Sequence, residues 1–179
     1  VRKLFCASNK NNILTDFFRT GVYDTHREFH RTSSPSMDIL ISSNLERFLF
    51  EVAGRDAEKI KPWFLDRFRT GRFEIDAATK KAIDALVVPG WADEPRVFAE
   101  IKKIYEETGR VIDTHTAVAS AVSRDVGPKD GPAVIIASTA SPFKFSGDVY
   151  AAITGRAEPD EFKAIELLSE IAKEPAHRA

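Results

Sequence analysis

Cysteine is nearly absent from the 179-residue sequence, in which Cys6 is the single one. One thiol cannot form an intramolecular disulfide, and it is too few for a cysteine-rich zinc site. So little cysteine is typical of proteins from reducing compartments. The sequence therefore predicts a cytoplasmic protein.

Long apolar runs and an excess of charge of one sign are also missing. The N-terminal apolar run, Leu4 to Ala7, is too short for a signal peptide or a membrane span. Lys and Arg total 26 against 27 Asp and Glu, a net charge of -1 with His neutral. No basic field is present to bind a polyanion or an anionic membrane. We expect neither nucleic acid nor membrane among the partners.

Length and hydrophobic content predict one folded domain. Hydrophobic residues make up 43% of the sequence, enough for a core, and the length is that of an ordinary domain. The chain begins at Val1, directly before an apolar run, which is how an excised portion of a longer protein would look. We expect residues 1–179 to be such a portion and to fold as a single α/β unit.

Signatures of common active sites are missing too. No Gly-rich phosphate loop, nucleophile elbow or Cys/His pair occurs. His26, Glu28 and His30 resemble a zinc helix, but the zinc motif places Glu directly after the first His, and no third ligand is in view. The sequence predicts no metal site, and these histidines are interpreted as surface residues of a loop.

Short apolar segments alternate with amphipathic helices along the chain. The strongest strand signal is Ala133–Ala137, an unbroken apolar run typical of a central parallel strand covered on both faces. Leu4–Ala7 and Arg72–Ile75 are shorter candidates. Val22–Ser36 is interpreted as a long irregular connection, and Val87–Trp91 as a break in the pattern. The alternation predicts an α/β fold with a mostly parallel sheet and flanking helices.

Helix signals are clearer, because capping residues and glycines mark the ends of most segments. A capping box of Ser43 and Glu46 opens a helix that ends near Gly54. Pro62 is expected to bend the next helix or to delay its start. The predicted helices cover residues 13–20, 44–53, 57–68, 77–86, 94–108, 116–122, 146–154 and 159–172.

Ligands of α/β proteins commonly bind beyond the carboxyl ends of strands. Two segments are expected there, Ser8–Asn12 and Ser138–Lys144. The second one offers hydroxyl and amide donors to an anion or a heterocycle, or it forms a capping turn for the following helix. The sequence favours neither interpretation.

Two further polar clusters are candidates for a site. Asp113 and His115 precede a helix of small residues, where an N-cap is favoured over a general base. Asn44 and Arg47 lie near a helix N-terminus, an environment that suits a phosphate, although capping alone explains Ser43.

Consecutive blocks of the sequence resemble those of threonine synthases, in the same order. The blocks are Ala7-Ser8-Asn9, Asn12-Ile13-Leu14-Thr15, Thr20-Gly21-Val22-Tyr23-Asp24, Ser34-Pro35-Ser36-Met37-Asp38-Ile39, Ser42-Ser43-Asn44-Leu45-Glu46-Arg47, Tyr105-Glu106-Glu107-Thr108-Gly109, Asp113-Thr114-His115-Thr116-Ala117-Val118 and Ala137-Ser138-Thr139-Ala140-Ser141-Pro142-Phe143-Lys144-Phe145. The resemblance spans residue 1 to about residue 150. An ordered set of blocks is more specific than any single motif.

Threonine synthases are fold type II enzymes that use pyridoxal phosphate to convert O-phosphohomoserine and water into threonine and phosphate. The resemblance implies this activity for the parent protein, and a partial tryptophan-synthase-β-like architecture for the chain. The family's Schiff-base lysine and its phosphate loop belong to an N-terminal domain that precedes these blocks. We therefore expect the chain alone to be inactive, and to expose an apolar surface where that domain docks, which would also allow self-association.

The resemblance also implies roles for particular residues. Thr139 would lie against the pyridine nitrogen of the cofactor, and Ser138 would shape the same wall. The substrate-side candidates are Asn44, Arg47, His115 and Lys144. Lys144 belongs to the family's C-terminal block and does not correspond to the Schiff-base lysine. The family usually has His at Ser141, which slightly favours the alternative, a noncatalytic threonine-synthase-like module that binds a phosphate ligand or a protein.

Overall fold

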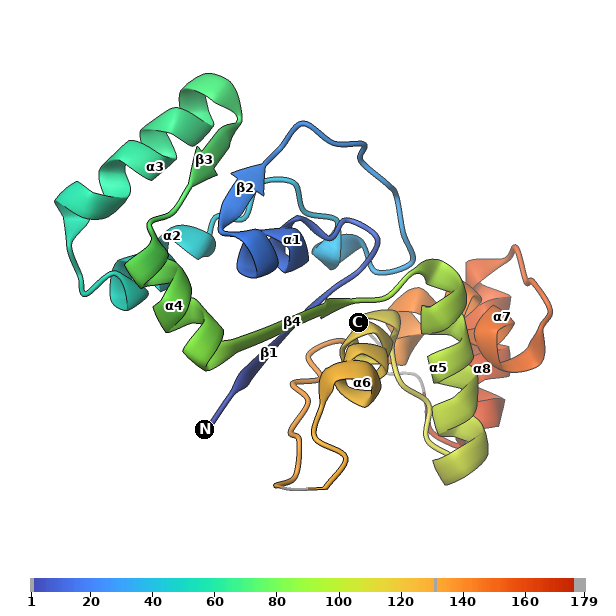
Figure 1. Cartoon of the computed structure of the whole chain (residues 1–179). Coiled ribbons are helices and arrows are strands. Elements are labelled where there is room, and N and C mark those ends of the chain that lie inside the picture. The colour runs from blue at the N-terminus through green and yellow to red at the C-terminus, as the bar shows by residue number, and fades with distance from the viewer. Residues whose placement is uncertain (1, 131, 176–179) are drawn as a thin grey trace. The chain divides into compact units, whose positions relative to one another are not determined.

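The computed structural model describes residues 2–130 and 132–175, and the chain divides into two compact units. Unit 1 comprises residues 1–31 and 37–91, and unit 2 comprises residues 32–36 and 92–179. In Figure 1 the elements from β1 to β4 belong to unit 1 and those from α5 to α8 to unit 2. The sequence analysis treated residues 1–179 as one unit.

Two pairs of short strands are found in unit 1. β1 (Leu4–Ser8) runs parallel to β4 (Val87–Trp91), and the two lie side by side in Figure 1. β2 (Val22–Asp24) is antiparallel to β3 (Arg72–Glu74). The fold is α/β with a parallel strand pair, as the sequence predicts.

The expected break at Val87–Trp91 is wrong, because this stretch is β4. Pro89 pairs opposite Cys6 within the parallel ladder. A strand tolerates proline where the missing N–H would face away from its neighbour. Among the described residues β4 pairs only with β1, so one side of the strand needs no amide donor. β2 likewise lies in the stretch that the sequence analysis expects to be irregular.

Four helices complete unit 1 and confirm the four predicted there. They are α1 (Ile13–Thr20), α2 (Leu45–Val52), α3 (Ala57–Thr70) and α4 (Ala77–Leu86). The start of α2 differs from the prediction, because its N-cap is Asn44 and the side chain of Asn44 makes no capping hydrogen bond. The predicted capping box of Ser43 with Glu46 is therefore wrong.

The ends of α3 are fixed by side chains at its start and by a glycine at its finish. Asp56 accepts a hydrogen bond from the Lys59 amide at 3.1 Å, so the helix starts well before Pro62 and the expected delay does not occur. Gly71 ends the helix with a φ of 73°, in the left-handed region that favours glycine. The Gly71 carbonyl oxygen accepts hydrogen bonds from the Thr25 amide at 2.9 Å and the Thr25 hydroxyl at 2.8 Å. This turn therefore ties α3 to the end of β2.

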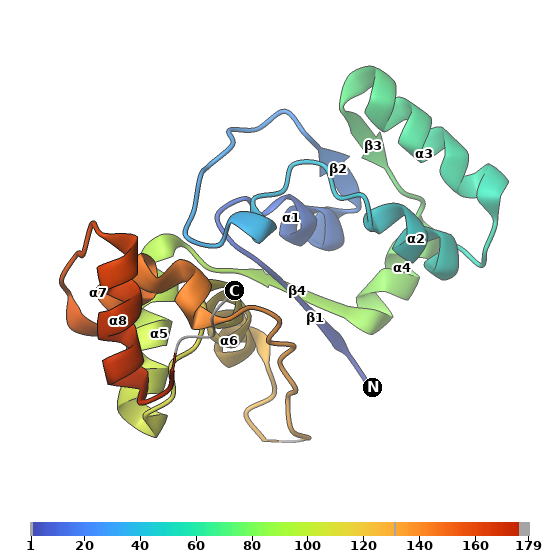
Figure 2. The same ribbon diagram turned by 180° about the vertical axis from the view of Figure 1, so that it is seen from behind.

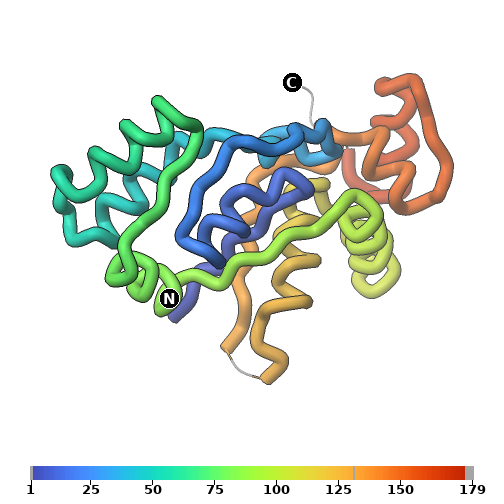
Figure 3. The backbone as a smooth tube through the Cα atoms, turned by 45° about the horizontal axis from the view of Figure 1, so that its top comes forward, coloured from blue at the N-terminus to red at the C-terminus, as the bar shows by residue number. Residues whose placement is uncertain are grey.

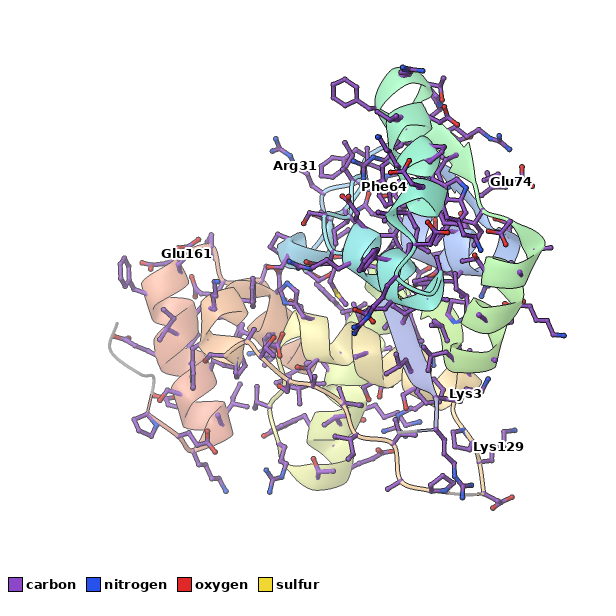
Figure 4. All side chains as sticks on the ribbon, turned by 90° about the vertical axis from the view of Figure 1, so that its left-hand side faces the viewer. Lys3, Arg31, Phe64, Glu74, Lys129 and Glu161 are labelled. Atoms are coloured by element: carbon purple, nitrogen blue, oxygen red, sulfur yellow. The ribbon has the colours of Figure 1, made fainter. Side chains whose placement is uncertain are left out.

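Aromatic rings build the core of unit 1. Phe17 is fully buried on α1, and its ring centroid lies within 5.7 Å of those of Phe18, Tyr23 and Phe73. Phe64, labelled on α3 in Figure 4, places its ring 5.6 Å from that of Phe73. The buried Tyr23 hydroxyl makes two backbone hydrogen bonds of 2.9 Å, and burial raises the pKa of Tyr23. Four elements, α1, β2, β3 and α3, thus share one aromatic cluster.

Among the described residues of unit 2, all regular elements are helices. The helices are α5 (Glu94–Thr108), α6 (Thr114–Val126), α7 (Ser146–Thr154) and α8 (Glu161–Ala172), with a 3-10 helix (Pro142–Phe145) before α7. They confirm the predicted helices. α5 packs against α6 and α7, and α7 packs against α8 (Figure 2). No helix in the part of the chain that the structure describes has the length and apolar character of a membrane span.

An ion pair between a buried glutamate and an exposed arginine joins α5 to α6. Glu100 is 2% exposed and accepts hydrogen bonds from Ser120 Oγ at 2.7 Å and Arg124 Nε at 2.6 Å. Arg124 also donates to Glu107 at 2.8 Å, and these hydrogen bonds to Glu100 and Glu107 raise the pKa of Arg124. Loss of Arg124 would leave the buried Glu100 carboxylate without its cation at the helix interface.

The predicted strand Ala133–Ala137 does not form. Residues 133–139 run without ladder hydrogen bonds after the α6 helix (Figure 3), and Ile135 is 92% exposed. A parallel strand depends on neighbouring strands and on cover over both faces. The described residues of unit 2 supply no strand that could pair with it.

Replacing Phe17 with alanine should destabilise unit 1 by about 3–5 kcal/mol, because the change leaves a cavity among aromatic rings. Phe68→Ala is the matched control. Phe68 is 88% exposed on α3, so its loss should change the unfolding free energy by no more than about 0.5 kcal/mol. Urea unfolding followed by near-UV circular dichroism measures both variants. Equal effects would contradict this assignment of the core.

The Cys6 thiol should react slowly in the folded chain. Burial raises its pKa from 9.0 to about 11, so near pH 8 the reactive thiolate is about 100-fold scarcer than in the unfolded chain. The raised pKa also means that the stabilising contribution of the neutral thiol is complete below pH 9.0 and is lost as the pH rises towards 11. Labelling with a thiol-specific disulfide reagent, with and without urea, measures the difference. Equal rates would show that β1 is not packed as described.

Candidate functional site

Asp113 organises the polar cluster at the start of α6. Its side chain is fully buried, and Oδ1 accepts hydrogen bonds from the amides of His115 at 2.9 Å and Thr116 at 3.2 Å. These amides have no acceptor within the helix, so the carboxylate caps α6. The N-cap interpretation of this block is confirmed.

The same carboxylate also orients the imidazole of His115. Nδ1 lies 3.2 Å from Asp113 Oδ1, while Nε2 accepts a hydrogen bond from the Ser36 amide at 3.2 Å. An amide can only donate, so Nε2 carries the lone pair and Nδ1 carries the proton. The ring also packs on Phe145, with centroids 4.7 Å apart. In this geometry the lone pair of His115 holds a backbone amide and is not free to act as a general base.

A chain of hydroxyls connects Asp113 with Ser138. Thr116 Oγ1 hydrogen-bonds to Asp113 Oδ2 and lies 2.8 Å from Ser138 Oγ. A hydroxyl has one proton, and Thr116 uses it in the hydrogen bond that it donates to the carboxylate. Ser138 therefore donates the hydrogen bond to Thr116. The lone pairs of Ser138 stay available on an exposed residue, and the next residue, Thr139, is exposed as well. The cluster therefore presents two neighbouring hydroxyls at one fixed point.

Residues 32–36 are bound to α5 and α6 by backbone hydrogen bonds. The Ser33 amide donates to Glu94 Oε2 at 3.0 Å, and the Ser33 carbonyl accepts from the Thr114 hydroxyl at 2.7 Å. Ser33 Oγ and Glu94 Oε1 are buried and have no hydrogen-bond partner among the described residues. An unpaired buried oxygen is costly, so each one calls for an explanation such as a functional role or a bound water or ion. Sequence reasoning missed both residues, since neither stands in a recognisable motif.

Ser138 lines a cavity of about 480 Å³ in unit 2. Its remaining lining residues are Gly109, Arg110, Val111, Ile112, Pro142, Ala172 and Glu174. Arg110 brings a positive charge to this cavity and Glu174 a negative one, while the Ser138 hydroxyl, whose proton is donated to Thr116, offers lone pairs. The sequence analysis missed Arg110, although it directly follows the glycine that ends α5.

Lys144 lies in a different cavity of unit 2, of about 540 Å³. Its ammonium group is 5.9 Å from the Phe145 ring centroid. The carboxylates that line the same cavity belong to Asp148, Glu158 and Glu161, and Figure 4 labels Glu161 at the start of α8. Burial and then the charge of Glu94 raise the pKa of Asp148. This surplus of negative charge opposes the binding of a phosphate beside Lys144.

The end of the Ser138–Lys144 segment is a capping turn. Ser141 Oγ accepts a hydrogen bond from the Phe143 amide at 3.3 Å and caps the 3-10 helix that leads into α7. The segment therefore contains both of the alternatives that the sequence left open: exposed hydroxyls at Ser138 and Thr139, and a cap at Ser141.

The candidate residues of unit 1 are bonded to one another. Arg47 donates a hydrogen bond from Nη2 to Asn44 Oδ1, and both side chains are exposed at the start of α2. In the Ser8–Asn12 segment, the buried Asn9 and Asn11 each donate to Asp38 Oδ1 at 2.8 Å. These asparagines hold the loop before α2 in place, which is a structural task.

His26 and His30 make separate contacts in unit 1. His26 Nδ1 lies 2.9 Å from Asp24 Oδ1, and His30 Nδ1 lies 3.8 Å from Glu28 Oε1. Across residues 2–130 and 132–175, no three or more His, Cys, Asp or Glu side chains are grouped so that they could hold a metal.

Comparison with known proteins agrees with the blocks and the fold. Residues 116–176 match the family model described as threonine synthase, C-terminal. The chain is 35% identical over 171 residues to the threonine synthase of Corynebacterium glutamicum and 40% identical over 154 residues to the human protein named Threonine synthase-like 1. It spans 36% and 21% of their respective lengths, and 92% and 86% of this chain is aligned.

Solved structures show the same relationship. The pyridoxal-phosphate-bound threonine synthase of Brucella melitensis superposes with a TM-score of 0.81 at 31% identity, over 97% of this chain and 36% of that one. The yeast threonine synthase superposes with a TM-score of 0.80 at 30% identity, over 93% of this chain and 37% of that one. The fold is therefore part of the fold type II architecture of pyridoxal-phosphate enzymes. The chain is similar in sequence and structure to threonine synthases, and it spans about a third of the length of the bacterial and yeast enzymes it matches.

Long-range ¹H–¹⁵N correlation spectra near pH 8 should show His115 protonated at Nδ1 and unprotonated at Nε2. The Asp113 carboxylate and the Ser36 amide together require this tautomer. Asp113→Asn should reduce the population of this tautomer, because an amide nitrogen can then face Nδ1. His26, with a side chain that is 69% exposed, is the internal control and should keep its spectrum in that variant. Protonation of His115 at Nε2 in the unsubstituted chain would contradict the described network.

Proposed function

We propose that this chain supplies one wall of a pyridoxal-phosphate site in a threonine synthase, which converts O-phosphohomoserine and water into threonine and phosphate. The observation that carries the proposal is the hydroxyl chain from Asp113 through Thr116 to Ser138. It holds the Ser138 side chain in place, next to Thr139, and both residues lie in the block for which the resemblance implies contact with the cofactor ring. The similarity to threonine synthases and the cofactor-bound Brucella melitensis structure support the same assignment.

The donors in this block fit the cofactor ring. Thr139 is exposed, and its side chain makes no hydrogen bond to another residue within the described part of the chain. A neutral hydroxyl can donate to the pyridine nitrogen and leave the ring largely unprotonated, whereas a carboxylate would favour its protonation. Thr139 would hold the nitrogen, and Ser138 would shape the adjacent wall. When bound, pyridoxal phosphate supplies an electron sink for the substrate carbons.

The other residues of this chain would bind and orient the substrate. Arg47 and Asn44 are exposed together at a helix N-terminus and present charged and neutral donors to a phosphate. Arg110 offers a second cation, in the cavity of Ser138. His115 remains a candidate on the substrate side, where it would position residues 32–36 through the Ser36 amide. Lys144 also remains a candidate, although its acidic surroundings do not favour a phosphate.

A second candidate function is a noncatalytic member of the family that binds a phosphate ligand or another protein. The 40% identity to the human protein named Threonine synthase-like 1 favours this candidate. So does Ser141, which stands where the family usually has His and whose hydroxyl caps a 3-10 helix in this chain. Under either function the chain would depend on an N-terminal domain, which in the enzyme would bring the Schiff-base lysine.

A chimera with the Corynebacterium glutamicum threonine synthase separates the two candidates. The segment of that enzyme that matches this chain is replaced by this chain, and phosphate release and threonine formation from O-phosphohomoserine are measured with added pyridoxal phosphate. We expect both products from the chimera and from the unmodified enzyme, and neither from this chain alone. A chimera that binds the cofactor and forms neither product would favour the noncatalytic candidate.

Thr139→Val in that chimera tests the hydroxyl directly, with Thr139→Ser as the matched control. Valine keeps the shape and removes the hydroxyl, so the affinity for pyridoxal phosphate should fall about 2- to 12-fold, the equivalent of one hydrogen bond of about 0.5–1.5 kcal/mol. Serine should keep the affinity. Absorbance titration of the cofactor provides the measurement and does not depend on turnover. Unchanged binding by the valine variant would exclude Thr139 as the partner of the ring nitrogen.

A further inference from the structure

The cavity of about 540 Å³ in unit 2 shares no lining residue with the cavity of Ser138. Its walls come from the 3-10 helix, the first turns of α7, and the start of α8 with the loop before it; α7 and α8 pack side by side (Figure 2). Phe143, Phe145, Ala151 and Ile165 supply apolar surface. Sites for small molecules have volumes of about 300–1,000 Å³ and combine apolar walls with a few polar groups. This cavity has both properties.

The charged groups of the cavity are mainly acidic. Asp148, Glu158 and Glu161 line it, together with one cation, Lys144. Glu158 lies 3.0 Å from the ammonium group of Lys163, which does not line the cavity. Asp148 and Glu161 form no ion pair with any residue in the described part of the chain. Two carboxylates of the cavity therefore lack a counter-charge.

Lys144 does not neutralise these two carboxylates. Its ammonium nitrogen lies 5.9 Å from the centroid of the Phe145 ring, and a ring attracts a cation within about 6 Å of its centroid. The structure contains no ion pair between Lys144 and either Asp148 or Glu161. The lysine therefore leaves the cavity with an excess of acceptors.

Further acceptors without donors lie on and beside α5, the helix that packs against α7. Glu94 Oε1 and Ser33 Oγ are buried without a hydrogen-bond partner among the described residues, and Ser33 is 8% exposed. The Ser33 amide donates to Glu94 Oε2 at 3.0 Å, which places the two unpaired oxygens near each other. Burial and then the charge of Glu94 raise the pKa of Asp148. These observations do not depend on the shape of the cavity, and they indicate a shortage of positive charge beside Asp148.

We propose that this cavity binds a small organic cation that carries a primary ammonium group. Such a group has a positive charge and three hydrogen-bond donors, which match the carboxylates of Asp148 and Glu161. The rings of Phe143 and Phe145 suit the cation, and the aliphatic walls suit its hydrocarbon part. A bare metal ion would leave these walls uncovered, and the carboxylates would repel an anion. This inference goes beyond the proposed function and does not rest on it.

Occupation of the cavity would reach the candidate site through Phe145. The Phe145 ring lines the cavity and also packs on His115, with centroids 4.7 Å apart. His115 Nε2 in turn accepts the hydrogen bond of the Ser36 amide at 3.2 Å. A ligand that shifts the Phe145 ring would therefore change the position of residues 32–36, which would give the cavity a regulatory role.

Titration of this chain with 1,4-diaminobutane tests the site, and 1,4-butanediol is the neutral control of the same length. Amide ¹H–¹⁵N spectra are recorded at an ionic strength of about 0.15 M, where attraction between distant exposed charges is screened. We expect the diamine to shift the amides of residues 143–151 with a dissociation constant below about 1 mM, and the diol to shift none. Shifts that do not saturate, or an equal response to the diol, would overturn the proposal.

Asp148→Asn locates the bound cation, with Glu166→Gln as the matched control. Both substitutions remove one negative charge, but Glu166 is exposed on α8 and does not line the cavity. Loss of a charged hydrogen-bond partner should weaken diamine binding about 10- to 150-fold in Asp148→Asn, whereas Glu166→Gln should bind as before. Near-UV circular dichroism checks that each variant is folded, and Glu161→Gln takes the place of an Asp148 variant that is not. Equal affinities of the lining variant and the control would overturn the site.

Lys144→Gln should have the opposite effect. It removes a like charge from the cavity, so the diamine should bind about 1.5- to 5-fold more tightly. Weaker binding would contradict a cationic ligand.

The ring resonances of His115 test the link to residues 32–36. They should shift during the titration with the same dissociation constant as the amides of the cavity, because Phe145 contacts both. His26, in unit 1, is the internal control and should not shift. Saturable diamine binding with unchanged His115 resonances would overturn the regulatory role. None of these measurements requires turnover, so their outcome is separate from that of the proposed enzyme function.

Discussion

The carboxylate of Asp113 performs three tasks that the rest of the candidate site depends on. It caps α6, it fixes the proton of His115 on Nδ1, and it accepts a hydrogen bond from the Thr116 hydroxyl. Through His115 it positions residues 32–36, and through Thr116 it positions Ser138. A buried charge is tolerated only with such a full set of donors. The hydrogen-bond donors that stabilise the Asp113 carboxylate therefore also position the other residues of the candidate site.

The helices could be predicted from the sequence because their ends are encoded locally. Asp56 and Asp93 cap their helices, and Gly71 and Gly109 end them in the left-handed conformation. Strands depend on partners that are distant in sequence, and the errors at residues 87–91 and 133–137 follow from that dependence. Val87–Trp91 forms a strand despite its proline and glycine, because β1 lies beside it. The apolar run at 133–137 stays unpaired, because the described residues of unit 2 contain no strand.

The sequence predicts which segments form the candidate site, but it does not predict which of their side chains contact one another. The sequence correctly favoured a cap over a base at Asp113, since the preference for Asp at an N-cap is local. The tautomer of His115 depends on the Ser36 amide, far away in the sequence, so no spacing rule could reveal it. Arg110 became a candidate only when the fold placed it around the same cavity as Ser138. The resemblance to threonine synthases named the right blocks, and geometry distinguishes the residues within them.

The turn at Gly71 restricts how this surface can change during evolution. A side chain there would meet Thr25 Oγ1 at 2.7 Å and His26 Cε1 at 2.8 Å, and the left-handed backbone would be strained as well. Gly109 ends α5 in the same conformation, but a Cβ there would meet no atom within 4 Å. The two glycines look alike in the sequence, yet only Gly109 can be exchanged for asparagine at the small cost of its backbone angle. At the α3–β3 junction, substitution of Gly71 is therefore opposed by contacts with Thr25 and His26, which cannot be recognised from the sequence.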